Sequence, residues 1–182
     1  MRYYPKIIGE RIYLSPINLD EDITQYTKWM NDNGITDNLG VSGTLYNLEK
    51  EKAALEEIRD NGYCFAVIRK EGDVLLGNVG FLDVNHIHRN AECGLFIGEI
   101  DQRNLGYGKE ALRLLLRYGF DVLNFNNVML HVFSFNRTAI ACYEKVGFRK
   151  AGARRQAYFL NGEYHDELWM DILSEEFHGQ GK

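Results

Sequence analysis

Two kinds of hydrophobic periodicity divide this chain into predicted strands and helices. Apolar and polar residues alternate in short runs, the pattern of strands with one buried face. In longer runs, apolar residues recur every three or four positions, which indicates amphipathic helices. The predicted strands cover residues 11–17, 63–69, 75–84, 91–97, 127–133, 148–160 and 164–173. The predicted helices cover residues 18–30, 47–59, 111–123 and 137–146.

The order of these elements predicts an α/β (α+β) fold, with a mixed, mostly antiparallel, twisted sheet of about seven strands and helices on both faces. The chain of 182 residues has the length of a single domain, residues 1–182. We expect an ordered core from about residue 8 to residue 173 and a polar tail over 174–182. Residues 35–45 mix Thr, Asp, Asn and Gly and are expected to form a loop with a short turn.

Charge and cysteine usage narrow the class of protein. The net charge of −5 and the lack of a basic run argue against nucleic acid as a partner and favour a cationic substrate. Cys64, Cys93 and Cys142 show no C-x-x-C spacing, so buried thiols are expected rather than a disulfide or a zinc site. The sequence has neither an apolar leader nor a run of ~18 apolar residues. We therefore expect a cytoplasmic protein with no membrane partner.

Glycines stand at the junction between the predicted strand 91–97 and the following helix. The segment reads Arg103-Asn104-Leu105-Gly106-Tyr107-Gly108. The first turn of a helix leaves backbone N–H groups without intrahelical partners, and the helix dipole adds partial positive charge there. Glycines let an anion approach these groups closely. Arg103 and Lys109 add charge, so this segment is interpreted as a cradle for a pyrophosphate.

Two other phosphate-binding motifs are excluded by their context. A dinucleotide fingerprint needs a short turn directly after its strand and an acidic residue about twenty positions on, and neither is present. A P-loop needs Ser or Thr after its lysine, whereas Glu110 follows Lys109.

A second motif follows the strand 127–133. It contains Asn136, Ala139, Tyr143, Gly147 and Phe148 at fixed spacing. With Arg-x-x-Gly-x-Gly before it, the sequence resembles the GCN5-related N-acetyltransferases, and most closely the branch of spermidine acetyltransferases and ribosomal-protein N-terminal acetyltransferases. This resemblance implies acetyl-CoA as co-substrate, bound by residues 103–108 and by Asn136, Ala139 and Tyr143. It also implies that the backbone of Phe96, Ile97 and Gly98 pairs with the pantetheine arm.

Tyr143 is the candidate general acid. It lies two helical turns after Asn136, so the two side chains share a face. The resemblance implies that its hydroxyl points at the thioester sulfur, although its spacing would also suit a core aromatic residue. Asn136 is either a plain helix cap or a contact to the pantetheine amide, and one side chain can serve as both.

Glu92 is the candidate general base. Strand alternation places it on one face with Gly94 and Phe96. A carboxylate within an apolar strand is costly unless it is paired or functional, and burial would raise its pKa into a useful range. The alternatives are a structural bond to a nearby Arg or Tyr and a place on an exposed strand face. His86 and His88 are weaker base candidates, and no third ligand supports a metal site there, so no metal is expected.

The acceptor is expected to be a primary amine, either a polyamine or other small amine or a protein N-terminus. Carboxylates that could surround a polyamine are Asp32, Asp37, Glu49 and Glu163, and they also suit an ordinary surface. The matching region shows no adjacent pair of glutamates of the kind found in the spermidine branch. The resemblance implies direct attack by the amine in a ternary complex. A catalytically inactive CoA-binding regulatory module is the alternative function, and a homodimer is expected from general frequency.

Overall fold

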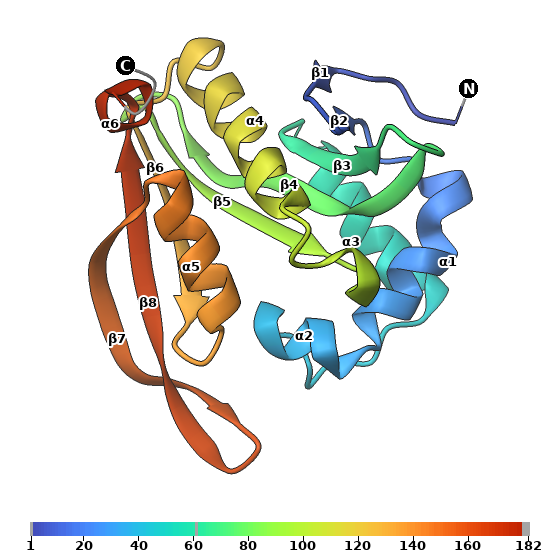
Figure 1. The fold of residues 1–182 in the computed structure, drawn as a ribbon. Helices are drawn as coiled ribbons and strands as arrows, with labels where there is room; N and C mark the ends of the chain where they lie inside the picture. Colours follow the sequence, from blue (N-terminus) through green and yellow to red (C-terminus); the bar gives the residue numbers. More distant parts are fainter. Residues whose placement is uncertain (1, 61, 180–182) are drawn as a thin grey trace. The chain divides into compact units, whose positions relative to one another are not determined.

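The structure is a computed structural model that describes residues 2–60 and 62–179. Within these residues the strands form an eight-stranded sheet in the order β1-β2-β3-β4-β5-β6-β8-β7 (Figure 1). The β5–β6 pair is parallel, whereas the pairs β1–β2, β2–β3, β3–β4, β6–β8 and β7–β8 are antiparallel. The elements in chain order are β1 (Ile7–Ile8), β2 (Ile12–Ser15), α1 (Leu19–Met30), α2 (Asn33–Leu39), α3 (Leu48–Asp60), β3 (Cys64–Arg69), β4 (Val74–Asn85), β5 (Asn90–Ile97), the 3-10 turn η1 (Ile100–Gln102), α4 (Tyr107–Asp121), β6 (Asn127–Phe133), α5 (Arg137–Val146), β7 (Arg149–Leu160), β8 (Glu163–Leu173) and α6 (Ser174–Gly179).

The chain divides into two compact units. Unit 1 comprises Met1–Leu82 and Gly94–Leu115, and unit 2 comprises Asp83–Cys93 and Leu116–Lys182. Strands β4 and β5 and helix α4 each pass from one unit into the other.

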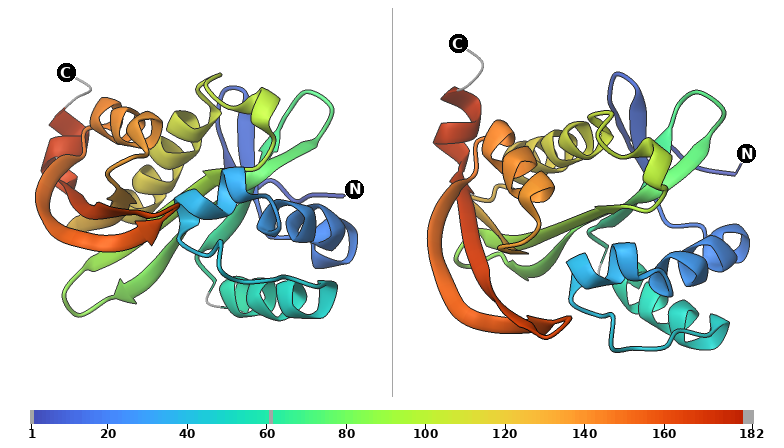
Figure 2. Two further views of the ribbon diagram at one scale, coloured as in Figure 1. Left: turned by 90° about the horizontal axis from the view of Figure 1, so that it is seen from below. Right: turned by 60° about the horizontal axis from the view of Figure 1, so that its bottom comes forward.

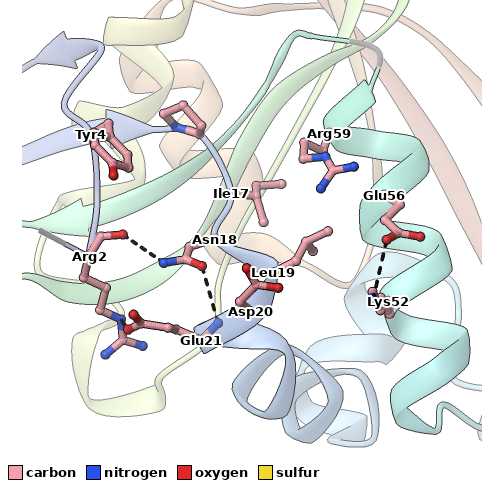
Figure 3. Close-up of a pocket in the computed structure, with 11 residues that line it drawn as sticks. Arg2, Tyr4, Ile17, Asn18, Leu19, Asp20, Glu21, Lys52, Glu56 and Arg59 are labelled. Carbon is pink, nitrogen blue, oxygen red and sulfur yellow. Dashed lines mark hydrogen bonds and ion pairs between the residues drawn. The ribbon is translucent and has the colours of Figure 1, made fainter.

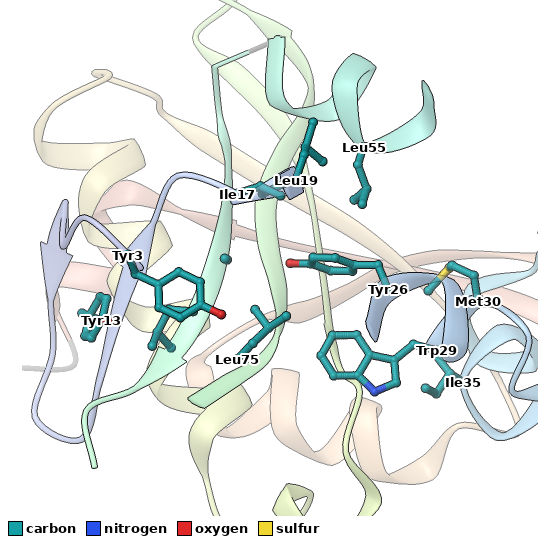
Figure 4. Close-up of a cluster of buried hydrophobic side chains, with 12 residues drawn as sticks. Tyr3, Tyr13, Ile17, Leu19, Tyr26, Trp29, Met30, Ile35, Leu55 and Leu75 are labelled. Carbon is teal, nitrogen blue, oxygen red and sulfur yellow. The ribbon is translucent and has the colours of Figure 1, made fainter. Parts of the chain in front are cut away.

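Unit 1 has a core between its first helices and its strands. The α1 residues Tyr26 and Trp29 are 0% and 2% exposed and meet edge to face, with ring centroids 5.4 Å apart. Leu55 of α3 and Leu75 of β4 complete the cluster from other elements (Figure 4). The hydroxyl of Tyr26 donates to Oδ1 of Asn78, so the buried phenol has a partner.

Strand alternation gives unit 1 a second apolar face. Tyr13 of β2 belongs to the cluster around Trp29, while its neighbours Ile12 and Leu14 are fully buried outside that cluster. Helices α1, α2 and α3 lie on one face of these strands and the first turns of α4 lie on the other (Figure 2). The alternation therefore positions the start of α4 above the strands of unit 1.

Unit 2 is built on the antiparallel strands β6, β8 and β7. Strand β6 pairs in parallel with β5 from Asn90 to Glu92 only. The curved β7–β8 hairpin (Figure 2) turns at Asn161 and Gly162, with φ of 52° and 87°. Helix α5 begins at the cap Asn136, whose side chain accepts from Ala139 N, and ends at the left-handed Gly147.

The structure confirms the predicted fold class and adds three elements. Strand β1 and helix α6 were not predicted, and α2 lies where a loop was expected. Helix α2 forms because Asp32 caps its start, Gly40 adopts a left-handed φ of 75° at its end, and Ile35 is buried in the cluster around Trp29. The expected polar tail is helical over Ser174–Gly179, and residues 180–182 lie outside the described residues. The single domain stays a prediction.

Among residues 2–60 and 62–179, no helix combines the length and the apolar character needed to cross a membrane.

Candidate functional site

The predicted cradle lies at the start of α4 in unit 1. Gly106 has a φ of 87° and Tyr107 is the first helical residue. Glu110 N donates to Gly106 O at 3.1 Å, so the regular helical bonding begins there. The N–H groups before Glu110 belong to the first turn, which has no intrahelical acceptors. The local geometry matches an anion-binding helix start.

Arg11 stands beside this helix start and was not identified from the sequence. Its Nη1 donates to Leu105 O at 2.8 Å, and its guanidinium lies 4.8 Å from the centre of the Tyr107 ring. Its Nε bonds Oε2 of Glu110 at 3.0 Å. These contacts place a cation at the cradle and fix it from three directions.

Arg103 has a different environment from the one expected. Its Nε donates to Ile97 O at 2.9 Å, its Nη2 to Gly98 O at 3.1 Å and its Nη1 to Gly34 O at 3.3 Å. The guanidinium therefore joins the end of β5 to α2. A contact from Arg103 to a phosphate stays a prediction.

Several backbone groups at the end of β5 already form hydrogen bonds within the protein. Gly98 N donates to Leu76 O at 2.8 Å, and both Ile97 O and Gly98 O accept from Arg103. Parallel pairing with β6 stops at Glu92, so it does not extend to residues 94–97. Pairing of Phe96, Ile97 and Gly98 with pantetheine stays a prediction, with these two carbonyls already engaged.

Gly108 tests whether the cradle fits a CoA diphosphate. A glycine within a helix costs about 1 kcal/mol relative to alanine. A Cβ at residue 108 would lie 3.5 Å from Leu95 and 3.7 Å from Ile97, which is ordinary contact. Packing against the described residues therefore does not require glycine here. A glycine that packing does not require fits a place where a ligand phosphate approaches the backbone closely.

Tyr143 lies in unit 2, on α5, and is 8% exposed. Its ring centroid is 6.1 Å from that of Phe148. Burial raises the pKa of the Tyr143 hydroxyl above its usual range, so the phenol keeps its proton at neutral pH. Asn136 caps α5 through Ala139 N at 3.1 Å, which confirms the cap. Contacts of Asn136, Ala139 and Tyr143 with the cofactor stay predictions.

Glu92 is paired with a histidine, and not with the Arg or Tyr of the structural alternative. Nδ1 of His131 lies 2.6 Å from Oε1 of Glu92, and the two side chains are 39% and 19% exposed. The hydrogen bond to Glu92 raises the pKa of His131, burial opposes this, and the charges of Glu92 and Glu167 add to the increase. His131 was not identified from the sequence. It lies two residues after Met129, which pairs with Glu92 in the parallel β5–β6 register, and this register is known only from the structure.

The other candidates have simpler surroundings. Lys109 and Glu49 are exposed, and the Asp32 carboxylate caps α2 through Gly34 N at 2.8 Å. Glu163 and Asp37 are exposed and half-buried, respectively. The structure brings no group of three or more His, Cys, Asp or Glu within residues 2–60 and 62–179 into an arrangement that could hold a metal ion. His86 packs its ring 5.9 Å from that of Phe125.

A cavity of about 500 Å³ in unit 1 does not involve any predicted site residue (Figure 3). It opens between the start of α1 and α3. Its charged lining residues are balanced in sign and carry mutual ion pairs, such as Lys52 with Glu56 at 3.9 Å. This cavity holds neither the glycine cradle nor the catalytic candidates, and we do not assign it to catalysis.

Comparison with known proteins identifies the family of this chain. A sequence model of the acetyltransferase (GNAT) domain matches residues 11–149. The spermidine N(1)-acetyltransferase of Vibrio cholerae is 31% identical over 129 residues, which are 71% of this chain and 74% of that protein. The corresponding Escherichia coli K12 enzyme is 33% identical over 106 residues, or 58% of this chain and 56% of that protein.

A solved structure supports the same assignment. The Vibrio cholerae spermidine N-acetyltransferase in complex with CoA and spermine superposes with a TM-score of 0.82 at 26% identity, covering 92% of this chain and 98% of that one. The family and the branch inferred from the sequence are therefore confirmed. The chain belongs to the GNAT acetyltransferase family and is an acyltransferase that uses acetyl-CoA as its co-substrate.

Proposed function

We propose that this enzyme acetylates a cationic primary amine of the polyamine type by direct attack on acetyl-CoA in a ternary complex. The relatives named above are spermidine acetyltransferases, one of them solved with spermine. The net charge of −5 favours encounter with such a substrate. A protein N-terminus is the second acceptor to be tested. A cytoplasmic location and a homodimer stay predictions.

On the cofactor side, the start of α4 is proposed to hold the diphosphate. The observation that carries this proposal is Gly108: packing would leave space for a Cβ there, so packing alone does not explain the glycine. The backbone of residues 104–108 supplies donors, and Arg11 supplies charge. Asn104 and Leu105 are exposed at this loop, and Tyr107 carries the guanidinium of Arg11 over its ring.

On the chemical side, Tyr143 is proposed to protonate the leaving thiolate. Its raised pKa keeps the phenol protonated at neutral pH, so the hydroxyl still carries a proton when the thiolate departs. Glu92 acts on the base side, through the pair it forms with His131. An acetyl-cysteine intermediate is disfavoured at Cys64, because burial raises the pKa of its thiol to about 12.

Thiol release from acetyl-CoA with a panel of amines tests the function. The panel contains spermidine, spermine, an aminoglycoside and ribosomal-protein N-terminal peptides. We expect release with the polyamines, together with acetylated product in the mass spectrum. Tight CoA binding without thiol release for any amine would instead support the inactive CoA-binding module.

Tyr143→Phe tests the proposed acid. We expect kcat to fall by about 10²-fold or more, because proton transfer by a positioned group contributes that much. The Kd for CoA, measured by calorimetry, should stay within twofold. Tyr4→Phe is the control, since Tyr4 is 66% exposed. Unchanged turnover in Tyr143→Phe would remove this residue from the acid role.

A further inference from the structure

The pair of His131 and Glu92 has a polarity that suits proton transfer. Nδ1 of His131 lies 2.6 Å from Oε1 of Glu92, so Nδ1–H donates to the carboxylate. This fixes the tautomer and leaves Nε2 as the ring nitrogen with a lone pair. Among the described residues, none is found in a hydrogen bond to Nε2. The histidine side chain is 39% exposed, so part of the imidazole is open to solvent.

The surroundings of His131 suit an alkyl ammonium group. The ring of Trp169 on β8 lies 5.5 Å from the His131 ring, and that of Phe133 lies 6.4 Å away. Aromatic faces attract cations, and most strongly in the case of tryptophan. The charged groups facing His131 are Glu92 from β5 and Glu167 from β8, and Glu167 contacts Arg154 of β7 at 3.7 Å. Negative charge and aromatic surface thus meet around one imidazole.

A purely structural role does not account for this arrangement. A carboxylate held for stability alone needs its hydrogen bonds satisfied, which does not require a partner with a second titratable nitrogen. Here the Glu92 side chain is 19% exposed, and it bonds Nδ1 of a 39% exposed imidazole whose Nε2 takes no part in that bond. This is the arrangement in which a carboxylate orients a histidine base.

We infer that His131 is the group that takes the proton from the acceptor ammonium, and that Glu92 is a positioning residue that orients its ring. This inference rests on the proposed function. The ammonium gives one proton to Nε2, and its freed lone pair forms the C–N bond while the thioester C–S bond breaks. The thiolate takes the proton of Tyr143. The second nitrogen proton restores the Tyr143 hydroxyl through solvent, and the proton on His131 returns to solvent.

This assignment predicts a pH dependence with a defined sign. The bond to Glu92 raises the pKa of His131, and only the neutral ring can accept a proton. The kcat/KM for an amine should therefore rise with pH through the pKa of His131, well below the amine's own ionisation near pH 10. In Glu92→Gln the pKa of His131 should fall, so the rise should move to lower pH.

The experiment combines pH profiles with a direct titration. In His131→Gln we expect kcat/KM to fall by about 10²- to 10⁴-fold, with loss of the lower limb. Glu92→Gln should lower kcat/KM less and shift that limb, whereas His178→Gln, at an exposed histidine of α6, should leave both kcat/KM and the limb unchanged. Imidazole resonances followed by NMR in the protein without ligands should show a His131 pKa above 6.5 that decreases in Glu92→Gln. Thermal melts confirm that each variant is folded.

The possible outcomes test the role of His131 separately from the proposed function. Wild-type protein that acetylates amines, with a His131→Gln variant that keeps the lower limb, would overturn the role of His131 and leave the proposed function standing. Wild-type protein that releases no thiol with any amine would overturn the proposed function, whatever the NMR titration shows. A His131 pKa that is unmoved in Glu92→Gln would overturn the positioning role of Glu92.

Discussion

Gly106 offers a sharp test of the cofactor loop, because the chain has a second glycine with the same backbone conformation. Gly106 and Gly162 both have a φ of 87°. A side chain in this left-handed region costs roughly 1–2 kcal/mol. Alanine at either position should therefore lower the free energy of unfolding by about that amount, and the melting temperature by roughly 2–8 °C.

The surroundings of the two glycines differ. A Cβ at residue 106 would lie 3.2 Å from Nη2 of Arg11, whereas a Cβ at residue 162 meets no atom within 4 Å. The methyl group at residue 106 would stand where the diphosphate is proposed to approach. Losing one hydrogen bond to a charged group costs about 1.5–3 kcal/mol. The Kd of Gly106→Ala for CoA should therefore rise by roughly 10- to 150-fold.

Calorimetric titration of CoA into the wild type, Gly106→Ala and Gly162→Ala, with melts on the same samples, measures both effects. We expect similar destabilisation in the two variants but weakened CoA binding only in Gly106→Ala. An unchanged Kd in Gly106→Ala, or equal weakening in both, would refute the placement of the diphosphate at the start of α4.

Two stability predictions follow from buried groups in unit 1. Burial raises the pKa of Glu51 to about 7, so the stability that its neutral form gives is lost as pH rises from about 4.5 through 7. Glu51→Gln should therefore remove up to about 3 kcal/mol of pH dependence, measured by urea unfolding at pH 5 and pH 8, while the exposed Glu49→Gln should not. At Gly98, an added Cβ would lie 2.1 Å from the Trp29 ring, so Gly98→Ala should lower the unfolding free energy by about 1–3 kcal/mol or more. Gly43→Ala, with no atom within 4 Å of its Cβ, is the control, and equal midpoints for both would contradict the crowding at Trp29.

Local signals in the sequence were sufficient for much of the fold. Strand β6 and helix α5 begin and end where predicted, because alternation, the cap at Asn136 and the left-handed Gly147 all act within a few residues. Helix α2 was missed because its residues have weak helical preference. The burial of Ile35 against α1 outweighs that preference, and burial by distant residues is not visible in a local pattern.

The difference between local patterns and contacts with distant residues also explains why two residues of the candidate site were not predicted. Arg11 reaches Leu105 across 94 positions, and His131 reaches Glu92 across 39. Both contacts depend on which strands lie side by side and in which register. The sequence marked Glu92 as an unusual carboxylate in an apolar strand, but its partner depended on the parallel pairing of Glu92 with Met129.

The three carbonyl bonds of Arg103 make one side chain a mechanical link between segments far apart in sequence. Gly34 O on α2 and the carbonyls of Ile97 and Gly98 share a single planar cation. A lysine would keep the charge but could not span these acceptors, since its donors radiate from one atom. Arginine at this motif position therefore holds the end of β5 and α2 together. A sequence search that counts it only as a positive charge for the ligand would misjudge which replacements the enzyme tolerates.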